Sequence, residues 1–160
     1  MTLPKILLVL GGLASTPAWA QLAVGSCSAT ATAIPFGAYD PTSSTPLTPT
    51  GSVSVSCHLI SGVSLAVLYT ITLTTGASGS YLNRKMTGTS TPMYYNLYLN
   101  SGLTQVWGDG VSGGSVSKTD GYLLGVGTVT LSYTVYSKVP AQQLVAAGSY
   151  LDSIIVQVAY

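Results

Sequence analysis

Residues 150–160, YLDSIIVQVAY, alternate apolar and polar side chains at a period of two, which is typical of a β-strand. Ile154, Val156, Val158 and Tyr160 fall on one face of this strand. The strand runs to the last residue, with no turn or closing partner strand after it. We therefore expect a sheet that lacks one strand, so that apolar surface and unpaired backbone groups are open to a second chain.

The same alternation recurs along the chain. Four more segments alternate apolar residues with serine, threonine, tyrosine or asparagine, namely residues 53–57, 69–73, 93–99 and 129–135. Alternating alanines at 29, 31 and 33 suggest a first strand that also carries Cys27. Turns are expected at residues 40–50, 76–80, 108–114 and 147–149. A helical period is missing from residues 21–160, so the pattern predicts an all-β sandwich of immunoglobulin-like type.

The N-terminal segment has the three parts of a secretory signal peptide. Lys5 supplies a positive charge, residues 6–13 form an apolar core, and Ala18-Trp19-Ala20 is a small-residue cleavage signature. The apolar core is shorter than the roughly 20 residues that span a bilayer. We expect residues 1–20 to be removed on export, and residues 21–160 to form one domain.

Charge is scarce in the expected mature chain. Only 6% of all residues are charged, while 47% are hydrophobic. Of the five lysines and arginines Lys5 lies in the leader, so four positive charges balance four aspartates and the net charge is zero. This composition offers no basic patch for nucleic acid and no polybasic segment for anionic lipid. It does favour association with other chains.

The two cysteines, Cys27 and Cys57, are expected to form a disulfide, since the chain is expected to be exported and their number is even. Closing a loop of about 30 residues would stabilise the fold by about 3–4 kcal/mol. A metal site is the weaker interpretation, because only His58 is available as a further ligand nearby.

The candidate catalytic patterns do not assemble into a site. Residues 108–113 match the glycine spacing of a dinucleotide-binding loop, but no helix pattern follows them. His58 has no serine in a nucleophile-elbow setting, and the four aspartates are far apart in sequence. Asp109 and Asp120 lack the spacing of a calcium loop. We therefore expect no enzymatic activity, no cofactor and no metal.

Short motifs, in a fixed order, make the chain similar to a known family. They are residues 36–41 (FGAYDP), 51–57 (GSVSVSC), 69–73 (YTITL), 84–86 (RKM), 95–98 (YNLY), 107–109 (WGD), 133–136 (YTVY), Gln142 or Gln143, and 148–152 (GSYLD). In this order the chain resembles the spore coat protein U domain, the subunit family of archaic chaperone–usher pili. Ser137-Lys138 stands where the family often has Gly-Arg, so the turn geometry of that corner is in doubt.

The resemblance implies an incomplete immunoglobulin-like β-sandwich that lacks its final strand. It implies three partners: a periplasmic chaperone that lends a strand, an outer-membrane usher, and neighbouring subunits that replace the chaperone's strand. The family's acceptor groove would be flanked here by Ile154, Ile155, Val156, Val158 and Tyr160. The protein would be exported through the periplasm to the cell surface, a pilus or the extracellular space.

Two finer expectations concern position and attachment. Residues 21–26 are short for a donor strand, which suggests a subunit that accepts a strand at a pilus tip without giving one. A tip subunit could serve attachment or biofilm formation through exposed apolar loop residues, with Val106, Trp107 and Val111, or Leu123 and Leu124, as candidates. The alternative for these residues is that they belong to the hydrophobic core. The alternatives are a stand-alone secreted coat or matrix protein and, less favoured, a carbohydrate-binding or hydrolytic β-sandwich.

Overall fold

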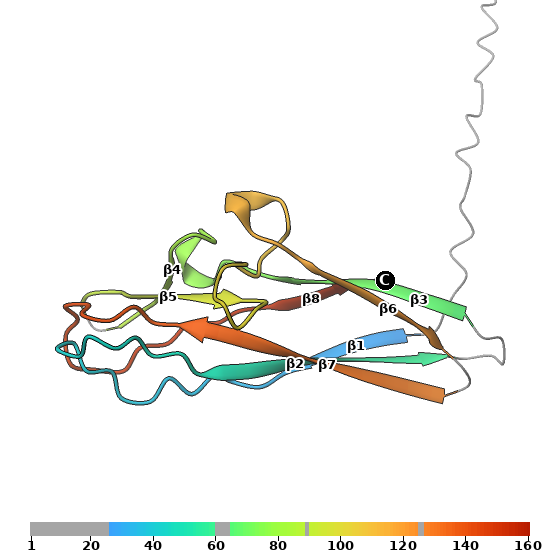
Figure 1. Cartoon of the computed structure of the whole chain (residues 1–160), viewed down its shortest axis with the longest axis horizontal. Helices are drawn as coiled ribbons and strands as arrows, with labels where there is room; N and C mark the ends of the chain where they lie inside the picture. The colour runs from blue at the N-terminus through green and yellow to red at the C-terminus, as the bar shows by residue number, and fades with distance from the viewer. Residues whose placement is uncertain (1–25, 60–64, 89, 125–126) are drawn as a thin grey trace, which may run out of the picture.

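The computed structural model describes residues 26–59, 65–88, 90–124 and 127–160 of the chain. Within these residues the protein consists of two antiparallel sheets that face each other, so the all-β prediction is confirmed (Figure 1). The leader expected at residues 1–20 and the short segment at 21–25 lie outside the described residues.

One sheet has five strands and the other has three. The larger sheet has the order β1-β2-β7-β5-β4, and its strands are β1 (Ser26–Ala31), β2 (Thr50–Leu59), β7 (Gly127–Lys138), β5 (Met93–Tyr98) and β4 (Arg84–Met86). The smaller sheet has the order β6-β3-β8, and its strands are β6 (Lys118–Leu124), β3 (Leu65–Leu73) and β8 (Val156–Ala159). Two single 3-10 turns, η1 (Gly76–Ser78) and η2 (Ser112–Gly114), lie in the connections.

The hydrophobic core lies between the two sheets and consists of the inward half of each alternating pattern. Val53 and Val55 of β2 and Ile71 of β3 are at most 1% exposed. The intervening serines and threonines face outward, as the alternation predicts. Burial of the apolar face of both sheets is therefore what holds the sandwich together.

The disulfide fixes the first strand to the second. Cys27 lies directly opposite Cys57 in the β1–β2 ladder, and their sulfur atoms are 2.06 Å apart. The expected pairing is confirmed. Because β1 is an edge strand with a single neighbour in its sheet, this covalent link is the firmest attachment of β1 to the sandwich.

The structure differs from the sequence-based expectation at two strands and at the terminus. β4 and β6 were not anticipated, because β4 is only three residues long and β6 contains Lys118, Asp120 and Gly121, which are poor strand formers. The last strand is confined to Val156–Ala159, since residues 152–155 form no ladder and Leu151 makes only an isolated bridge to Thr87.

Arg84 of β4 is fully buried and joins three parts of the fold. Its guanidinium donates to the carbonyl oxygens of Thr74 and Trp107, at 2.9 and 2.7 Å, and to Asn96 Oδ1 at 2.9 Å. Burial lowers the pKa of this guanidinium. The charge is thus used inside the protein to hold β4, β5 and the connection after β3 together.

Candidate acceptor groove

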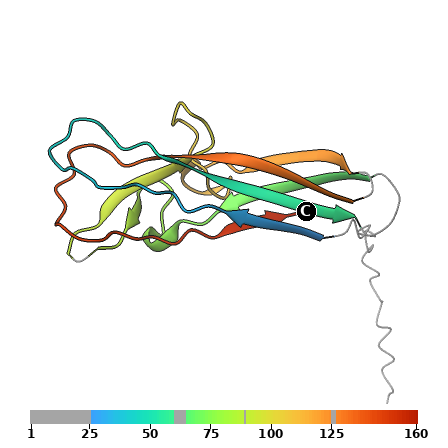
Figure 2. The same ribbon diagram turned by 90° about the horizontal axis from the view of Figure 1, so that it is seen from below.

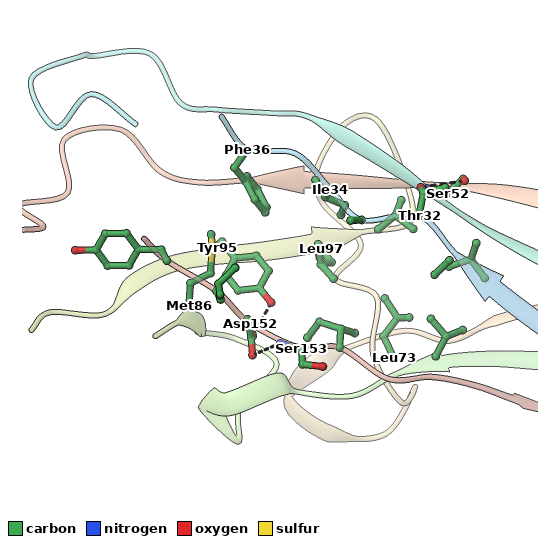
Figure 3. Close-up of a pocket in the computed structure, with 18 residues that line it drawn as sticks. Thr32, Ile34, Phe36, Ser52, Leu73, Met86, Tyr95, Leu97, Asp152 and Ser153 are labelled. Atoms are coloured by element: carbon green, nitrogen blue, oxygen red, sulfur yellow. Dashed lines mark hydrogen bonds between the residues drawn. The ribbon is translucent and has the colours of Figure 1, made fainter. Parts of the chain in front are cut away.

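A hollow of about 420 Å³ opens between the edge of the larger sheet and the edge of the smaller one (Figure 3). One lip is residues 31–36, at the end of β1 and just beyond it. The other is residues 150–154 together with Val156 at the start of β8. Figure 2 shows β1 (blue) and β8 (red) side by side along this edge. We call this hollow the acceptor groove.

The floor of the acceptor groove is the hydrophobic core itself. It is formed by side chains from four strands of the larger sheet and one of the smaller, namely Val53, Met86, Tyr95, Leu97, Val135 and Leu73. Each of these residues is at most 5% exposed, and each also lines the hollow. An apolar side chain that entered between the lips would therefore contact the core directly.

The backbone of the second lip is oriented for a further strand. Thr74 N donates to the carbonyl oxygen of Ile155 at 3.1 Å, and Ile155 N donates to Thr74 Oγ1 at 3.0 Å. Ile155 therefore directs its backbone groups toward β3. Because successive residues of an extended chain point these groups to opposite sides, Ile154, Val156 and Val158 direct theirs to the free edge of β8.

The first lip has the matching arrangement. Thr32 N donates to Ser52 O at 2.9 Å, so Thr32 and the residues of the same parity face β2. Cys27, Ala29 and Ala31 then direct their backbone groups to the outer edge of β1. The small alanine side chains leave space above the core at this lip. Although β1 and β8 are neighbours, they belong to different sheets and form no ladder with each other in the described part of the chain.

Asp152 braces the second lip. Its carboxylate accepts hydrogen bonds from Tyr95 Oη at 2.6 Å and from Ser153 N at 2.8 Å (Figure 3). It also accepts one from Ala77 N at 2.9 Å. Burial, reinforced by the bond to Asp152, raises the pKa of the Tyr95 phenol. Gly76, at φ 64°, has no room for a side chain, because a Cβ there would lie 2.2 Å from an oxygen of Asp152. The brace keeps the lip from collapsing into the groove.

The predicted groove residues fall into two groups. Ile154 and Val156 line the hollow, and Val158 is half-buried against the core further along β8. Ile155 and Tyr160 do not line it and are 61% and 54% exposed. The alternation of apolar and polar residues along 154–160 was enough to predict that Ile154, Val156 and Val158 face the inside of the sandwich.

The first lip and most of the floor were not identified from the sequence. Ile34 and Phe36 line the groove from the segment after β1, and the Phe36 ring packs edge-to-face on Tyr95 with centroids 5.8 Å apart. Phe36 is the single phenylalanine of the chain and follows the alternating alanines, which was the available signal.

The opposite edge of the sandwich, between β6 and β7, is closed by polar contacts. The hydroxyls of Tyr69 and Tyr133 are hydrogen-bonded, and Tyr133 Oη donates to Asp120 at 3.1 Å. Lys118 Nζ lies 3.3 Å from the same carboxylate. Burial and these bonds raise the pKa of Tyr133. The two edges therefore differ: one is tied across by hydrogen bonds, and the other exposes the core.

Of the two alternatives for Trp107, an exposed adhesive residue or a core residue, the structure shows the core residue. Its side chain is fully buried, and its indole nitrogen donates to Ile71 O at 3.2 Å. Burial follows from position, because Trp107 forms a bridge with Val116 and its amide donates to Leu97 O, which draws the ring between the sheets. Val106 is half-buried, whereas Val111 is 87% exposed on the loop that Asp109 caps.

Leu123, the alternative candidate, is 80% exposed on the outer face of β6. The side chain of Leu124 lies outside the described residues. Exposed apolar surface is thus present at Val111 and Leu123, which are on different parts of the molecule.

The part of the chain that the structure describes contains no cluster of side chains that could hold a metal ion. No three histidine, cysteine, aspartate or glutamate side chains converge there. His58 is exposed and bonded through Nδ1 to Thr128 Oγ1 at 3.0 Å. Among the same residues, no helix has the length and apolar character needed to cross a membrane.

Comparison with known proteins identifies a family. The family model of the Spore Coat Protein U domain matches residues 14–157. Among solved structures, the chain is similar to a chain in the crystal structure of the CsuC–CsuE chaperone–tip adhesion subunit pre-assembly complex from archaic chaperone–usher Csu pili of Acinetobacter baumannii, with 19% identity and a TM-score of 0.49. That match covers 84% of this chain and 39% of the other, so this chain spans less than half of the other's length. No curated protein matches the sequence.

Proposed function

The chain belongs to the Spore Coat Protein U domain family, and we propose that it is a structural subunit of a chaperone–usher pilus whose acceptor groove receives a strand from another polypeptide. The observation that carries this proposal is the groove itself. Two edge segments with outward-pointing backbone groups flank a gap whose floor is the hydrophobic core. A strand with apolar residues at every second position has the period and reach to fill it.

Three partners follow from this proposal. A periplasmic chaperone would fill the groove first, a neighbouring subunit would then replace it, and an outer-membrane usher would carry the subunit to the cell surface. Each large apolar side chain that becomes buried contributes about 1.5–3 kcal/mol, before the cost of ordering the incoming strand. A few such side chains plus a backbone ladder are enough to hold subunits together without a covalent bond.

We further propose a position at the pilus tip, with a role in attachment or biofilm formation. The exposed Val111 supports an attachment role, now without Trp107. A stand-alone coat or matrix protein is the second candidate, which the family description favours. The proposed role is structural rather than enzymatic.

Filling the groove from within tests strand acceptance. Ala31 lines the hollow, so Ala31→Leu should occupy part of it and weaken binding of a synthetic donor strand by at least about tenfold, because the leucine competes with a donor side chain. Ser28→Leu is the matched control, since Ser28 lies on the same strand and faces outward.

Binding is measured by the increase in melting temperature on adding the donor peptide. Equal binding by Ala31→Leu, Ser28→Leu and the unaltered chain would rule out this groove as the acceptor. Stable accumulation in the periplasm without any chaperone would favour the stand-alone coat protein.

A further inference from the structure

The outer face of the larger sheet is an uncharged array of hydroxyl groups. Every second residue of 26–30, 52–56 and 128–134 is serine or threonine, and these residues face away from the core. The strands are in register, so hydroxyls meet across them: Ser54 Oγ lies 2.7 Å from Ser132 Oγ, and Ser56 Oγ lies 2.7 Å from Thr130 Oγ1. We call this surface the hydroxyl face.

The absence of charge on the hydroxyl face is unusual for an exposed sheet. Sheets that face solvent ordinarily carry lysine or glutamate, which keep them from associating. No charged residue occurs in β1, β2 or residues 127–136 of β7, and Lys138 lies beyond this region at the end of β7. The face therefore presents groups that both donate and accept hydrogen bonds, without a preference for either sign of charge.

A second hollow adjoins the hydroxyl face at the edge of β7. β5 pairs with β7 only from Tyr136 to Lys138, so the preceding part of β7 has no partner on that side among the described residues of its sheet. A hollow of about 370 Å³ lies where β5 ends, and Gln105, Ser132, Thr134 and Tyr136 are among the residues that line it. We call it the β7 notch. Its size falls within the range of small-molecule sites, about 300–1,000 Å³.

The β7 notch offers fixed hydrogen-bonding groups. Ser137 N donates to Pro49 O, toward the β2 side, so Ser132 and Thr134, which have the opposite parity, direct their backbone groups to the notch. The loop that carries Gln105 is held by Asn100, whose Oδ1 accepts from Thr104 N and Gln105 N at 3.1 and 3.0 Å. The Gln105 amide and the Tyr136 hydroxyl are bonded to no other described side chain.

Among the described residues that line the notch, Lys118 is the single cation, and it is paired with an aspartate. Lys118 Nζ lies 3.3 Å from Asp120 and 5.5 Å from the centre of the Tyr133 ring. A charged ligand would lose hydration there without gaining an opposite charge. An uncharged ligand rich in hydroxyl groups would lose less hydration free energy. It could form hydrogen bonds with the amide, hydroxyl and free backbone groups of the notch and pack on the tyrosine rings.

We propose that the β7 notch and the adjoining hydroxyl face form a binding site for an uncharged polysaccharide, with one sugar unit in the notch and the chain continuing over the hydroxyl face. An added peptide strand is the competing occupant of a free edge. It is disfavoured because a single aliphatic side chain, Leu99, is found among the described residues that line the notch, whereas an added strand requires apolar pockets for alternate side chains. The other lining residues carry hydroxyl, amide or ammonium groups: Gln105, Lys118, Ser132, Tyr133, Thr134 and Tyr136. The site is separate from the acceptor groove and does not depend on strand acceptance.

The experiment uses the purified full chain and isothermal titration with three uncharged probes, cellohexaose, maltohexaose and N-acetylchitohexaose, and with oligogalacturonate as the charged probe. We expect at least one uncharged probe to bind, with affinity nearly unchanged in 1 M salt. Tyr136→Phe and Gln105→Ala should each weaken that binding about fivefold, the effect of one lost hydrogen bond.

Matched controls are Tyr94→Phe and Gln157→Ala, which change the same residue types on exposed positions outside the notch. Both should bind like the unaltered chain. Tyr136→Phe keeps the ring and therefore the packing, so its loss of affinity reports on the hydroxyl alone. The proposal is overturned if no uncharged probe binds, if oligogalacturonate binds better, if the control variants weaken binding equally, or if a donor peptide competes for the notch.

Discussion

Replacing Ile154 by alanine should lower the free energy of unfolding more when a donor strand is bound in the acceptor groove than when the groove is empty. Ile154 lines the acceptor groove and is partly buried in the chain alone. The substitution removes three carbon atoms, worth about 2.4 kcal/mol when fully buried at about 0.8 kcal/mol per methylene. Because between about two thirds and nine tenths of this side chain is already buried, we expect a loss of about 1.5–2.2 kcal/mol in the chain alone and about 2.4 kcal/mol once a donor strand covers it.

Ile155 is the matched control, because the same substitution at the next residue removes the same atoms. Its side chain is 61% exposed and does not line the groove. Ile155→Ala should therefore cost about 0.9 kcal/mol by the same calculation, and equally in the two states. Neither residue lies in a ladder strand, so strand propensity affects both alike.

The measurement is urea unfolding of the chain alone and of the chain saturated with a donor peptide. The difference between the two states, about 0.2–0.9 kcal/mol, should also appear as a peptide affinity of Ile154→Ala that is weaker by up to about fourfold. An equal loss in both states, or an effect of Ile155→Ala as large as that of Ile154→Ala, would show that residue 154 does not face the incoming strand.

Two further predictions concern the framework of the groove. Arg84→Met should lower the free energy of unfolding by about 3 kcal/mol, because the carbonyls of Thr74 and Trp107 and the Asn96 amide oxygen lose their buried donor. Lys85→Met, one residue away and half-exposed, should change it by about 0.5 kcal/mol or less in the same urea titration, and equal effects would contradict the assigned role. The second prediction concerns pH: since the pKa of Tyr95 is raised in the fold above its ordinary value of about 10, the folded state keeps the phenolic proton longer. The contribution of Tyr95 to the free energy of unfolding is complete below about pH 10 and is lost as the pH rises further. Tyr95→Phe should therefore reduce the fall in the free energy of unfolding above that pH, measured by urea unfolding at a series of pH values. An unchanged slope would contradict the assigned role of Tyr95.

Most of the fold could be predicted from the sequence, because its long strands have one buried and one exposed face. The alternation in β2, β3 and β7 assigned both the strand and the side that faces the core. β6 could not be found in this way, because Lys118, Asp120 and Gly121 break the pattern. It forms because β3 supplies a complete partner from Leu65 to Ile71, so tertiary pairing overrides local preference.

The candidate site was only half predictable for a related reason. One lip is a single continuous segment, so its alternation is visible in the sequence. The other lip, residues 31–36, is also continuous, but no local pattern shows that it meets floor residues as far apart as Met86 and Val135. The position of Trp107 was left open because its glycine-rich neighbours indicate a loop, whereas its own backbone bridges Leu97 and Val116 and carries the ring inward.

The β6–β7 edge and the β1–β8 edge of the sandwich differ in their side-chain contacts, and this difference affects how readily copies of the chain associate. The β6–β7 edge is closed by Tyr69, Tyr133, Asp120 and Lys118, whose polar contacts would be lost if a strand entered. The β1–β8 edge has alanines, valines and isoleucine facing an exposed core, and only Asp152 carries charge among the lining residues. A free edge of this kind invites pairing with any available strand. Because only 6% of the residues are charged and can keep copies apart, occupation of this groove would reduce such pairing, and the proposed chaperone would serve as much to prevent wrong pairing as to assist the right one.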